Sequence, residues 1–212
     1  MSKLRILTAA ALATTFAVSA VHAQQPQQQT QRLAGTIERV DGNTIFGKGR
    51  DGAAITLKLA DNVAVVAVLK ATVDDIKPGA YIGSGAVPQA DGSQKAVEVH
   101  IFAESMRGQG DGHRPGWYGA PNGTMTNGAV EPTGTVSTTV GAGGEPSFLV
   151  KYKEGEKRIV VPANAHIVRY DVGSKTDLKA GEQFAILAAA KQADGTFTAA
   201  RINVGKDGGR PF

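Results

Sequence analysis

Three short motifs occur twice in this sequence, in the same order, and this repetition constrains the fold more than any other feature. Residues 35–37 (Gly-Thr-Ile) recur at 134–136 as Gly-Thr-Val. Residues 75–79 (Asp-Ile-Lys-Pro-Gly) recur at 177–181, and residues 89–93 (Gln-Ala-Asp-Gly-Ser) recur at 192–196. The spacing between copies stays close to one hundred residues. The sequence therefore predicts a tandem duplication of one unit of about 70 residues.

The N-terminus has the three parts of a secretory signal peptide. Lys3 and Arg5 make it positively charged, an apolar and small-residue stretch follows over 6–20, and Val21-His22-Ala23 forms a cleavage site of the small-x-small type. The alternative is a membrane anchor, but an apolar run of about 15 residues falls short of the ~20 that span a bilayer. We therefore expect cleavage before Gln24, no membrane span, and a soluble protein exported to the periplasm.

Composition removes several classes of function. The chain has no Cys, which excludes disulfides, thiolate metal ligands, cysteine nucleophiles and lipid-anchored cysteines. The formal net charge is +4, and two of these positive charges, Lys3 and Arg5, leave with the signal peptide. The balanced mature chain argues against nucleic-acid binding, which needs clustered positive charge. A lone unit of about 70 residues is marginally stable, so we expect the two units to pack together.

The chain divides by composition into six segments. The signal peptide is followed by a polar Gln-rich leader, expected to be disordered, and the two units are separated by a Gly- and Pro-rich connector, expected to be irregular. A Gly-rich C-terminal tail is expected to be flexible. The predicted boundaries are 1–23 for the signal peptide, 24–32 for the leader, 33–106 for the first unit, 107–132 for the connector, 133–205 for the second unit and 206–212 for the tail.

Within each unit the dominant signal is the period-two alternation of β-strands. Ile55, Leu57 and Leu59 alternate with polar residues, as do the apolar residues of 96–101 and 200–204. Asp-Gly pairs such as 41–42 indicate hairpin turns. Residues 72–75 and 174–177 resemble capping boxes of a short helical turn, which Gly79 and Gly181 would end at positive φ. The prediction is an all-β fold of two tandem small antiparallel OB-like β-barrels, each with one short helical turn; a two-sheet sandwich is the alternative.

The repeated motifs also carry a resemblance to a protein family. The series Gly-Thr-[Ile/Val], Asp-[Ile/Leu]-Lys-x-Gly and Gln-Ala-Asp-Gly-[Ser/Thr] resembles a family of uncharacterised exported bacterial proteins with tandem OB-like β-barrel domains, whose longer members carry a connector similar to residues 112–115 and 123–127. Some members are labelled metal-transport permease components, which this chain cannot be without several membrane spans. The resemblance implies the fold and no catalytic residue, because its motifs are turn and cap residues.

The connector holds the candidate binding residues. It contains the only Trp of the chain, Trp117, beside Tyr118 and His113. Trp is favoured both in packed grooves and in contacts with partners, so we expect Trp117 either to pack between the two barrels or, with Tyr118 and His113, to contact a ligand or partner. Asp111, His113, Met106 and Met125 could alternatively bind a soft metal such as copper, although no ligand spacing enforces it.

Elsewhere no motif for catalysis, cofactor binding or metal binding is present. His100 and His166 do not lie at ligand spacing, and alternation places His100 on the solvent face of its strand. There is no G-x-S-x-G elbow or phosphate-binding loop. We therefore expect a non-enzymatic binding or interaction module that has no catalytic residue, cofactor or metal and recognises an unknown periplasmic protein or ligand. The alternatives are a metal-handling protein that uses the connector and a glycan-active enzyme with paired carboxylates such as Asp74 and Asp75.

Overall fold

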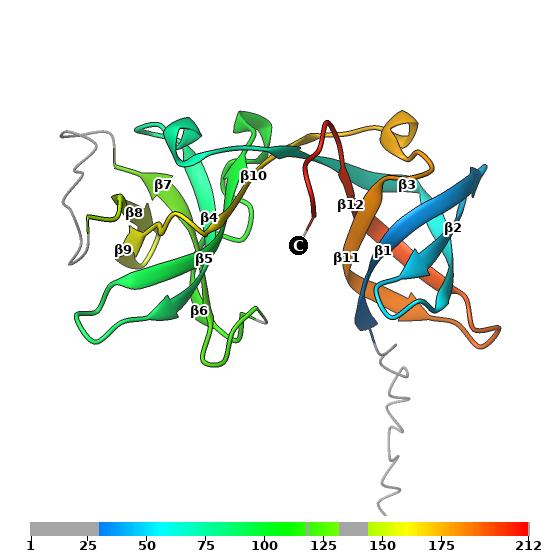
Figure 1. Ribbon diagram of the computed structural model, residues 1–212, viewed down its shortest axis with the longest axis horizontal. Coiled ribbons are helices and arrows are strands. Elements are labelled where there is room, and N and C mark those ends of the chain that lie inside the picture. The colour runs from blue at the N-terminus through cyan, green and yellow to red at the C-terminus, as the bar shows by residue number, and fades with distance from the viewer. Residues whose placement is uncertain (1–29, 118, 132–143, 212) are drawn as a thin grey trace, which may run out of the picture.

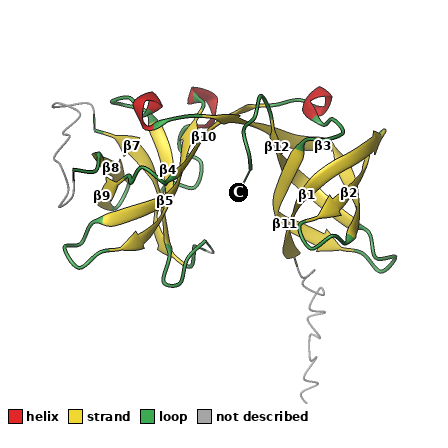
Figure 2. Ribbon diagram, in the orientation of Figure 1, coloured by secondary structure: helices red, strands yellow, loops and turns green. Residues whose placement is uncertain are grey.

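The computed structural model describes residues 30–117, 119–131 and 144–211, and it is an all-β protein with two lobes (Figure 1). The only helical elements in these ranges are three short 3₁₀ turns, η1 (Val73–Asp75), η2 (Glu104–Met106) and η3 (Lys175–Asp177). In the described part of the chain, no helix has the length and apolarity needed to cross a membrane. Strands dominate the rest of the fold (Figure 2).

Lobe A is a five-stranded barrel. Its strands are β1 (Thr30–Asp41), β2 (Thr44–Gly49), β3 (Ala54–Lys70), β11 (Gln183–Lys191) and β12 (Phe197–Gly205). Antiparallel pairing joins β11 to β1, β1 to β2, β2 to β3 and β11 to β12. Parallel pairing of β12 with β3 closes the ring. Closure removes exposed sheet edges and encloses an apolar core that contains Ile37, Leu57, Phe184 and Ile202.

Lobe B contains a second closed ring of pairings. Its strands are β4 (Tyr81–Pro88), β5 (Gln94–Phe102), β7 (Thr124–Val130), β8 (Ser147–Tyr152) and β9 (Gly155–Val160). Antiparallel pairing joins β5 to β4, β4 to β7, β7 to β8 and β8 to β9, and a short parallel pairing of β9 with β5 completes the ring. The short strand β6 (Gly112–Pro115) pairs with β7. Ile82, Val99, Val150 and Ile159 form the centre of its core.

Two strands form a bridge between the lobes. The far end of β3 pairs antiparallel with β10 (His166–Val172), and β10 also pairs in parallel with β5 of lobe B. Figure 1 shows these two strands crossing from one lobe to the other. A separate small core lies at the bridge and contains Val68, Met106, Val168 and Tyr170.

The pairing shows that each ring draws strands from both halves of the chain. Lobe A joins β1–β3 of the first predicted unit to β11 and β12 of the second, whereas lobe B joins β4 and β5 of the first to β8 and β9 of the second. Strands 33–106 therefore do not close a ring on themselves, as two successive barrels would require. Lobe B is a continuous segment of chain inserted between the two parts of lobe A.

The two capping boxes predicted from sequence are present and equivalent. The backbone N–H of Thr72 donates to Asp75 Oδ2 at 2.8 Å, and that of Ser174 donates to Asp177 Oδ2 at 2.9 Å. Gly79 and Gly181 follow at φ values of 78° and 89°. Each turn is joined to one lobe, since Gly79 N–H donates to a carbonyl of β7 in lobe B and Gly181 N–H donates to one of β1 in lobe A.

The first repeated motif has a different partner from the one predicted. Gly181 donates to the carbonyl of Ile37 and Gly79 donates to that of Val130, which makes residues 35–37 equivalent to 128–130. A Cβ on Gly35 would clash with the carbonyl of β2, and one on Gly128 would clash with the corresponding carbonyl of β8. Residues 134–136, which the sequence alignment selected, lie outside the described residues.

Three predicted irregular segments contain ordered structure. Residues 30–32 of the predicted leader belong to β1, because they continue its pairing with β11. The predicted connector contains β6 and β7, and β7 is an integral strand of lobe B. The tail is also ordered up to residue 211: Lys206 N–H donates to the carbonyl of Val68 at 2.9 Å, and the tail lies between the lobes (Figure 1). The signal peptide and residues 24–29 lie outside the described residues.

Candidate functional site

Lobe A presents a polar face on the outside of β2 and β3. Ile45 and Leu57 point into the barrel, so the alternating residues Phe46, Thr56 and Lys58 point outward. Register places Phe46 opposite Thr56 on β3 and opposite Arg39 on β1. The Arg39 guanidinium lies 3.5 Å from the centre of the Phe46 ring. We call Arg39, Phe46, Thr56, Lys58 and the adjoining Asp194 the lobe A face.

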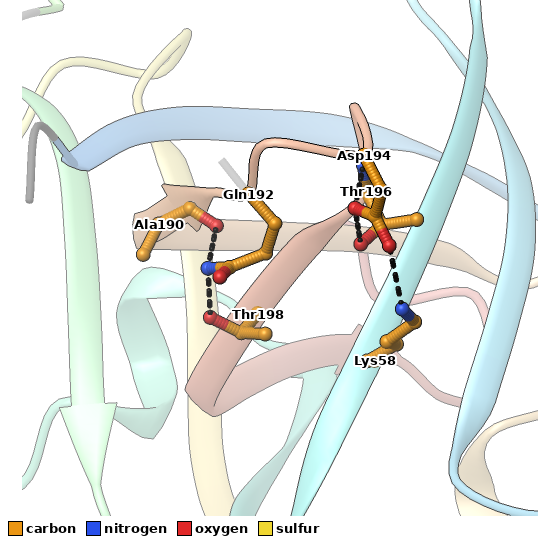
Figure 3. Close-up of polar contacts among 6 residues, drawn as sticks. All are labelled: Lys58, Ala190, Gln192, Asp194, Thr196 and Thr198. Carbon is orange, nitrogen blue, oxygen red and sulfur yellow. Dashed lines mark hydrogen bonds and ion pairs between the residues drawn. The ribbon is translucent and has the colours of Figure 1, made fainter.

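The turn between β11 and β12 joins this face through an ion pair. Lys58 Nζ lies 2.9 Å from Asp194 Oδ2. The other oxygen of Asp194 accepts hydrogen bonds from the backbone N–H of Thr196 at 3.0 Å and from its hydroxyl at 2.6 Å. Figure 3 shows these contacts on one side of the turn. The Thr196 and Lys58 hydrogen bonds hold the pKa of Asp194 well below its usual range, so the carboxylate is charged at neutral pH.

A second set of contacts orders the base of the same turn. Gln192 Nε2 donates to the carbonyl of Ala190 at 3.1 Å and to the hydroxyl of Thr198 at 3.0 Å (Figure 3). The turn is closed by the Gln192 N–H donating to the Thr196 carbonyl at 2.8 Å. The side chains of Lys58 and Asp194 nevertheless remain 51% and 55% exposed. The turn thus fixes the position of Asp194 while both charged groups stay accessible to solvent.

Lobe B contains a turn equivalent to the β11–β12 turn, but the residues on the adjoining strand differ from those of the lobe A face. The turn of residues 89–93 repeats the backbone and Asp91–Ser93 hydrogen bonds of the lobe A turn. The strand registers make Ile159 the counterpart of Leu57, so Val160 replaces Lys58. Val160 is buried. The ion pair between turn and strand is therefore specific to lobe A.

A buried polar cluster lies on the outer side of β5, toward the bridge. Glu98 is completely buried, and His100 is 8% exposed. The Nε2 of His100 contacts Oε1 of Glu98 and lies 3.1 Å from the hydroxyl of Tyr170. The rings of His100 and Tyr170 are stacked, with centroids 4.4 Å apart. The prediction that His100 faces solvent is wrong: His100 is buried, and its ring stacks on that of Tyr170 from β10, the strand that pairs with β5.

Burial shifts the proton affinities of this cluster in opposite directions. It raises the pKa of Glu98 to about 8, and the positive charge of Arg32 only partly opposes the shift. It lowers the pKa of His100 to about 3, with the neighbouring charges of His166 and Arg201 adding to the effect. At neutral pH the cluster therefore holds a protonated carboxyl beside a neutral imidazole. Such a pair can exchange a proton; Glu98 is fully buried, whereas 10% of the His100 side chain is exposed to solvent.

The structure describes two of the three predicted contact residues, Trp117 and His113. The Trp117 ring is 4% exposed and packs on the backbone of Gly85, Gly119 and Gly123, where a Cβ would clash with it. It lies against the outer side of β4 of lobe B. His113 Nδ1 lies 2.8 Å from the hydroxyl of Thr126. Tyr118 lies outside the described residues, and contact of Trp117, Tyr118 and His113 with a ligand stays a prediction.

The connector residues considered for a metal are dispersed. Asp111 accepts hydrogen bonds from the Tyr81 hydroxyl at 3.2 Å and from the Lys153 backbone at 2.8 Å. Met106 is buried in the core at the bridge, away from His113. Within residues 30–117, 119–131 and 144–211, no three His, Cys, Asp or Glu side chains are placed to hold a metal ion.

Sequence reasoning missed both the lobe A face and the Glu98–His100 cluster. Phe46 and Lys58 have an ordinary amphipathic alternation around them, and only the packing of the β11–β12 turn against β3 distinguishes them. The one available signal was the Asp-Gly-Thr turn itself. Comparison with known proteins adds no further guide: no family model, no curated protein and no solved structure matches this chain.

Proposed function

We propose that this chain is an exported, non-enzymatic binding module made of two OB-like barrels that arose by duplication. The ring order β1-β2-β3-β12-β11, with β3 and β12 parallel, supports an OB-like reading of lobe A. The equivalent capping boxes and turns of the two lobes support the duplication. Export rests on the signal-peptide pattern of residues 1–23.

The lobe A face is the proposed binding surface. OB-fold proteins bind extended polymers on the face of strands 2 and 3 and on the loops 1–2 and 4–5. The corresponding positions here are β2, β3, the β1–β2 turn and the β11–β12 turn. Because an exposed ion pair contributes little to folding, the ordered Lys58–Asp194 pair supports a role in recognition. This pair is the observation on which the proposal rests most.

The proposed ligand is an extended oligosaccharide. Phe46 offers an aromatic ring, and Lys58, Asp194 and Thr56 offer donors and acceptors within the same face, the mixture that sugar rings require. The balanced charge of the mature chain disfavours a polyanion such as nucleic acid.

Titration of purified protein with hexasaccharides of glucose and of N-acetylglucosamine tests the proposal. We expect a heat of binding with at least one hexamer, and Phe46→Ala and Lys58→Ala should each weaken it about tenfold. Leu149→Ala is the matched control, because this residue is exposed on the corresponding side of lobe B. Binding that survives both lobe A variants, or binding only to peptides, contradicts the proposal.

The alternative functions are assigned to other parts of the chain. A metal-handling role would use Asp111, His113, Met106 and Met125. The first three of these side chains are engaged in separate contacts. An enzyme using Asp74 and Asp75 would need both carboxylates, whereas Asp75 caps η1. The Lys58–Asp194 arrangement favours the binding module over both.

A further inference from the structure

The C-terminal tail folds back into the space between the lobes. After β12, residues 206–209 make a tight turn in which Gly209 N–H donates to the Lys206 carbonyl at 2.9 Å. Asp207 and Gly208 have φ values of 49° and 79°, which permits the sharp reversal. Lys206 is anchored by an ion pair of 2.9 Å with Asp177. The chain beyond this turn runs down between the two lobes (Figure 1).

The segment after the turn makes backbone contacts with both lobes. His166 Nε2 donates to the carbonyl of Arg210 at 2.9 Å, and Arg50 approaches the carbonyl of Pro211 at 3.5 Å. Arg50 belongs to lobe A, and His166 begins β10 beside lobe B. Gly209 and Pro211 are buried although the side chain between them is exposed. The protein therefore holds this segment mainly through its backbone, as it would hold a bound peptide.

The contact between the tail and β3 requires a glycine at position 209. A Cβ on Gly209 would clash with the carbonyl of Val68 and with the backbone of Leu69. Neither group can move without disturbing β3, which pairs with both β10 and β12 at this point. A groove of about 380 Å³ continues beside the tail along Lys70, Ala165 and His166. The site thus has no room for a Cβ at position 209, and the groove leaves free space beside that position.

We propose that this inter-lobe groove is a binding site for an extended peptide segment containing a glycine pair, and that residues 208–211 fill it in cis. The partner is a segment of another protein with the chemistry of Gly-Gly-Arg-Pro. Its second glycine takes the place of Gly209 against the Val68 carbonyl. The carbonyl of the residue after that glycine accepts a hydrogen bond from His166. A competing peptide displaces the tail from the groove and takes its place. This site is separate from the lobe A face, so the two proposals stand or fall independently.

Removing the tail and supplying it as a separate peptide tests the proposal. A chain ending at Lys206 keeps the ion pair with Asp177, and the probe is a fluorescein-labelled peptide Asp-Gly-Gly-Arg-Pro-Phe. We expect the shortened chain to bind it at least about tenfold more tightly than the full chain, whose groove is filled. Valine at the second glycine of the peptide should weaken binding about tenfold or more.

Variants of the shortened chain locate the binding. His166→Ala should weaken binding several-fold, because the carbonyl after the glycine pair loses its donor. Leu187→Ala, at an exposed position on β11, should leave it unchanged. Circular dichroism establishes that each variant is folded. A folded shortened chain that does not bind the peptide, or that binds the valine peptide equally well, overturns the proposal.

A second measurement uses the full chain and does not depend on the folding of the shortened one. Excess unlabelled peptide should displace the tail in cis, so the chain's own Gly209 amide should exchange its hydrogen faster. Exchange of the Val150 amide, in the core of lobe B, should not change. If the shortened chain does not fold, this measurement decides: unchanged exchange at Gly209 overturns the proposal.

Discussion

Replacing Glu98 with glutamine should remove a pH dependence of stability that the fold itself creates. Burial raises the pKa of Glu98 to about 8, from an ordinary value of 4.5. Between pH 6.5 and pH 8 the folded chain therefore keeps this proton while the unfolded chain has lost it. The folded state binds one more proton in this range, so the free energy of unfolding falls as the pH rises. The slope is about 1.4 kcal/mol per pH unit near pH 6.5 and about half of that at pH 8, where half of the folded chains have lost the proton, so the total across the window is about 1.6 kcal/mol.

The window is chosen to exclude the opposing effect of His100. Burial lowers the pKa of His100 to about 3 from an ordinary 6.5, so its contribution to stability is fully present above 6.5 and is lost as the pH falls below that value. Above pH 6.5 the imidazole is neutral in the folded chain, and in the unfolded chain its protonated fraction falls from one half to about a tenth by pH 7.5. In the folded chain Glu98 is therefore the member of the cluster that titrates between pH 6.5 and pH 8.

Urea unfolding at three pH values across this window measures the slope. The unmodified chain should lose stability with rising pH, and Glu98→Gln should show a slope near zero. Glu104→Gln is the matched control: the hydrogen bond from Arg107 lowers the pKa of this exposed carboxyl, so it is ionised in both states throughout the window. An equal slope in Glu98→Gln and the unmodified chain would refute the account of the buried carboxyl.

Two further substitutions test local parts of the structure. Gly79→Ala and Gly181→Ala should each cost about 1 kcal/mol, since both glycines have positive φ, and thermal melting of the two variants should show similar losses; an insensitive Gly181 would contradict their equivalence. Trp117→Ala should cost about 3–5 kcal/mol in urea unfolding, because it empties a buried site walled by glycine backbone. A loss below about 1 kcal/mol would show that the ring is not structural.

Local features of this fold could be read from the sequence because neighbouring residues determine them. Thr72 and Asp75, or Ser174 and Asp177, satisfy each other's backbone groups within four residues, so the capping boxes form wherever the chain leads. The Asp-Gly turns follow for the same reason. The all-β class also followed from period-two alternation, since either face of a barrel strand repeats every second residue.

The pairing of strands distant in the chain could not be predicted, because the strands of the two halves have nearly the same hydrophobic alternation. Strand β11 offers β1 the same alternation that β4 would, so the sequence does not state which one pairs with β1. The long strand β3 decides it, since it leads the chain out of lobe A before β4 begins. The similarity of the two halves also explains why the sequence matched residues 35–37 to 134–136, whereas the structure makes them equivalent to 128–130. Gly-Thr at 134–135 matches Gly35-Thr36 in letters, whereas Gly128 matches Gly35 in its contact with the adjacent strand.

The polar sites were hidden for a related reason. Glu98 and His100 alternate with Val99 and Ile101 as solvent-facing residues normally do, yet both are buried, and the ring of Tyr170 from β10 stacks on His100. The lobe A face joins β3 to a turn more than 130 residues later in the chain, which no local pattern indicates. Both depend on which strands pair, and two half-sequences of similar pattern leave that open.

Disulfide formation between strands of different halves tests the exchanged pairing most directly, and the chain has no native Cys to interfere. Register places Thr36 of β1 opposite Gln183 of β11, so Thr36→Cys with Gln183→Cys should form an intramolecular disulfide under mild oxidation. In two successive barrels Gln183 would instead face Ala129, which the equivalence of Gly35 with Gly128 makes the counterpart of Thr36. Mass spectrometry of the two double variants should detect a disulfide between positions 36 and 183 and none between positions 129 and 183. The reverse result would contradict the exchange of strands between the two halves.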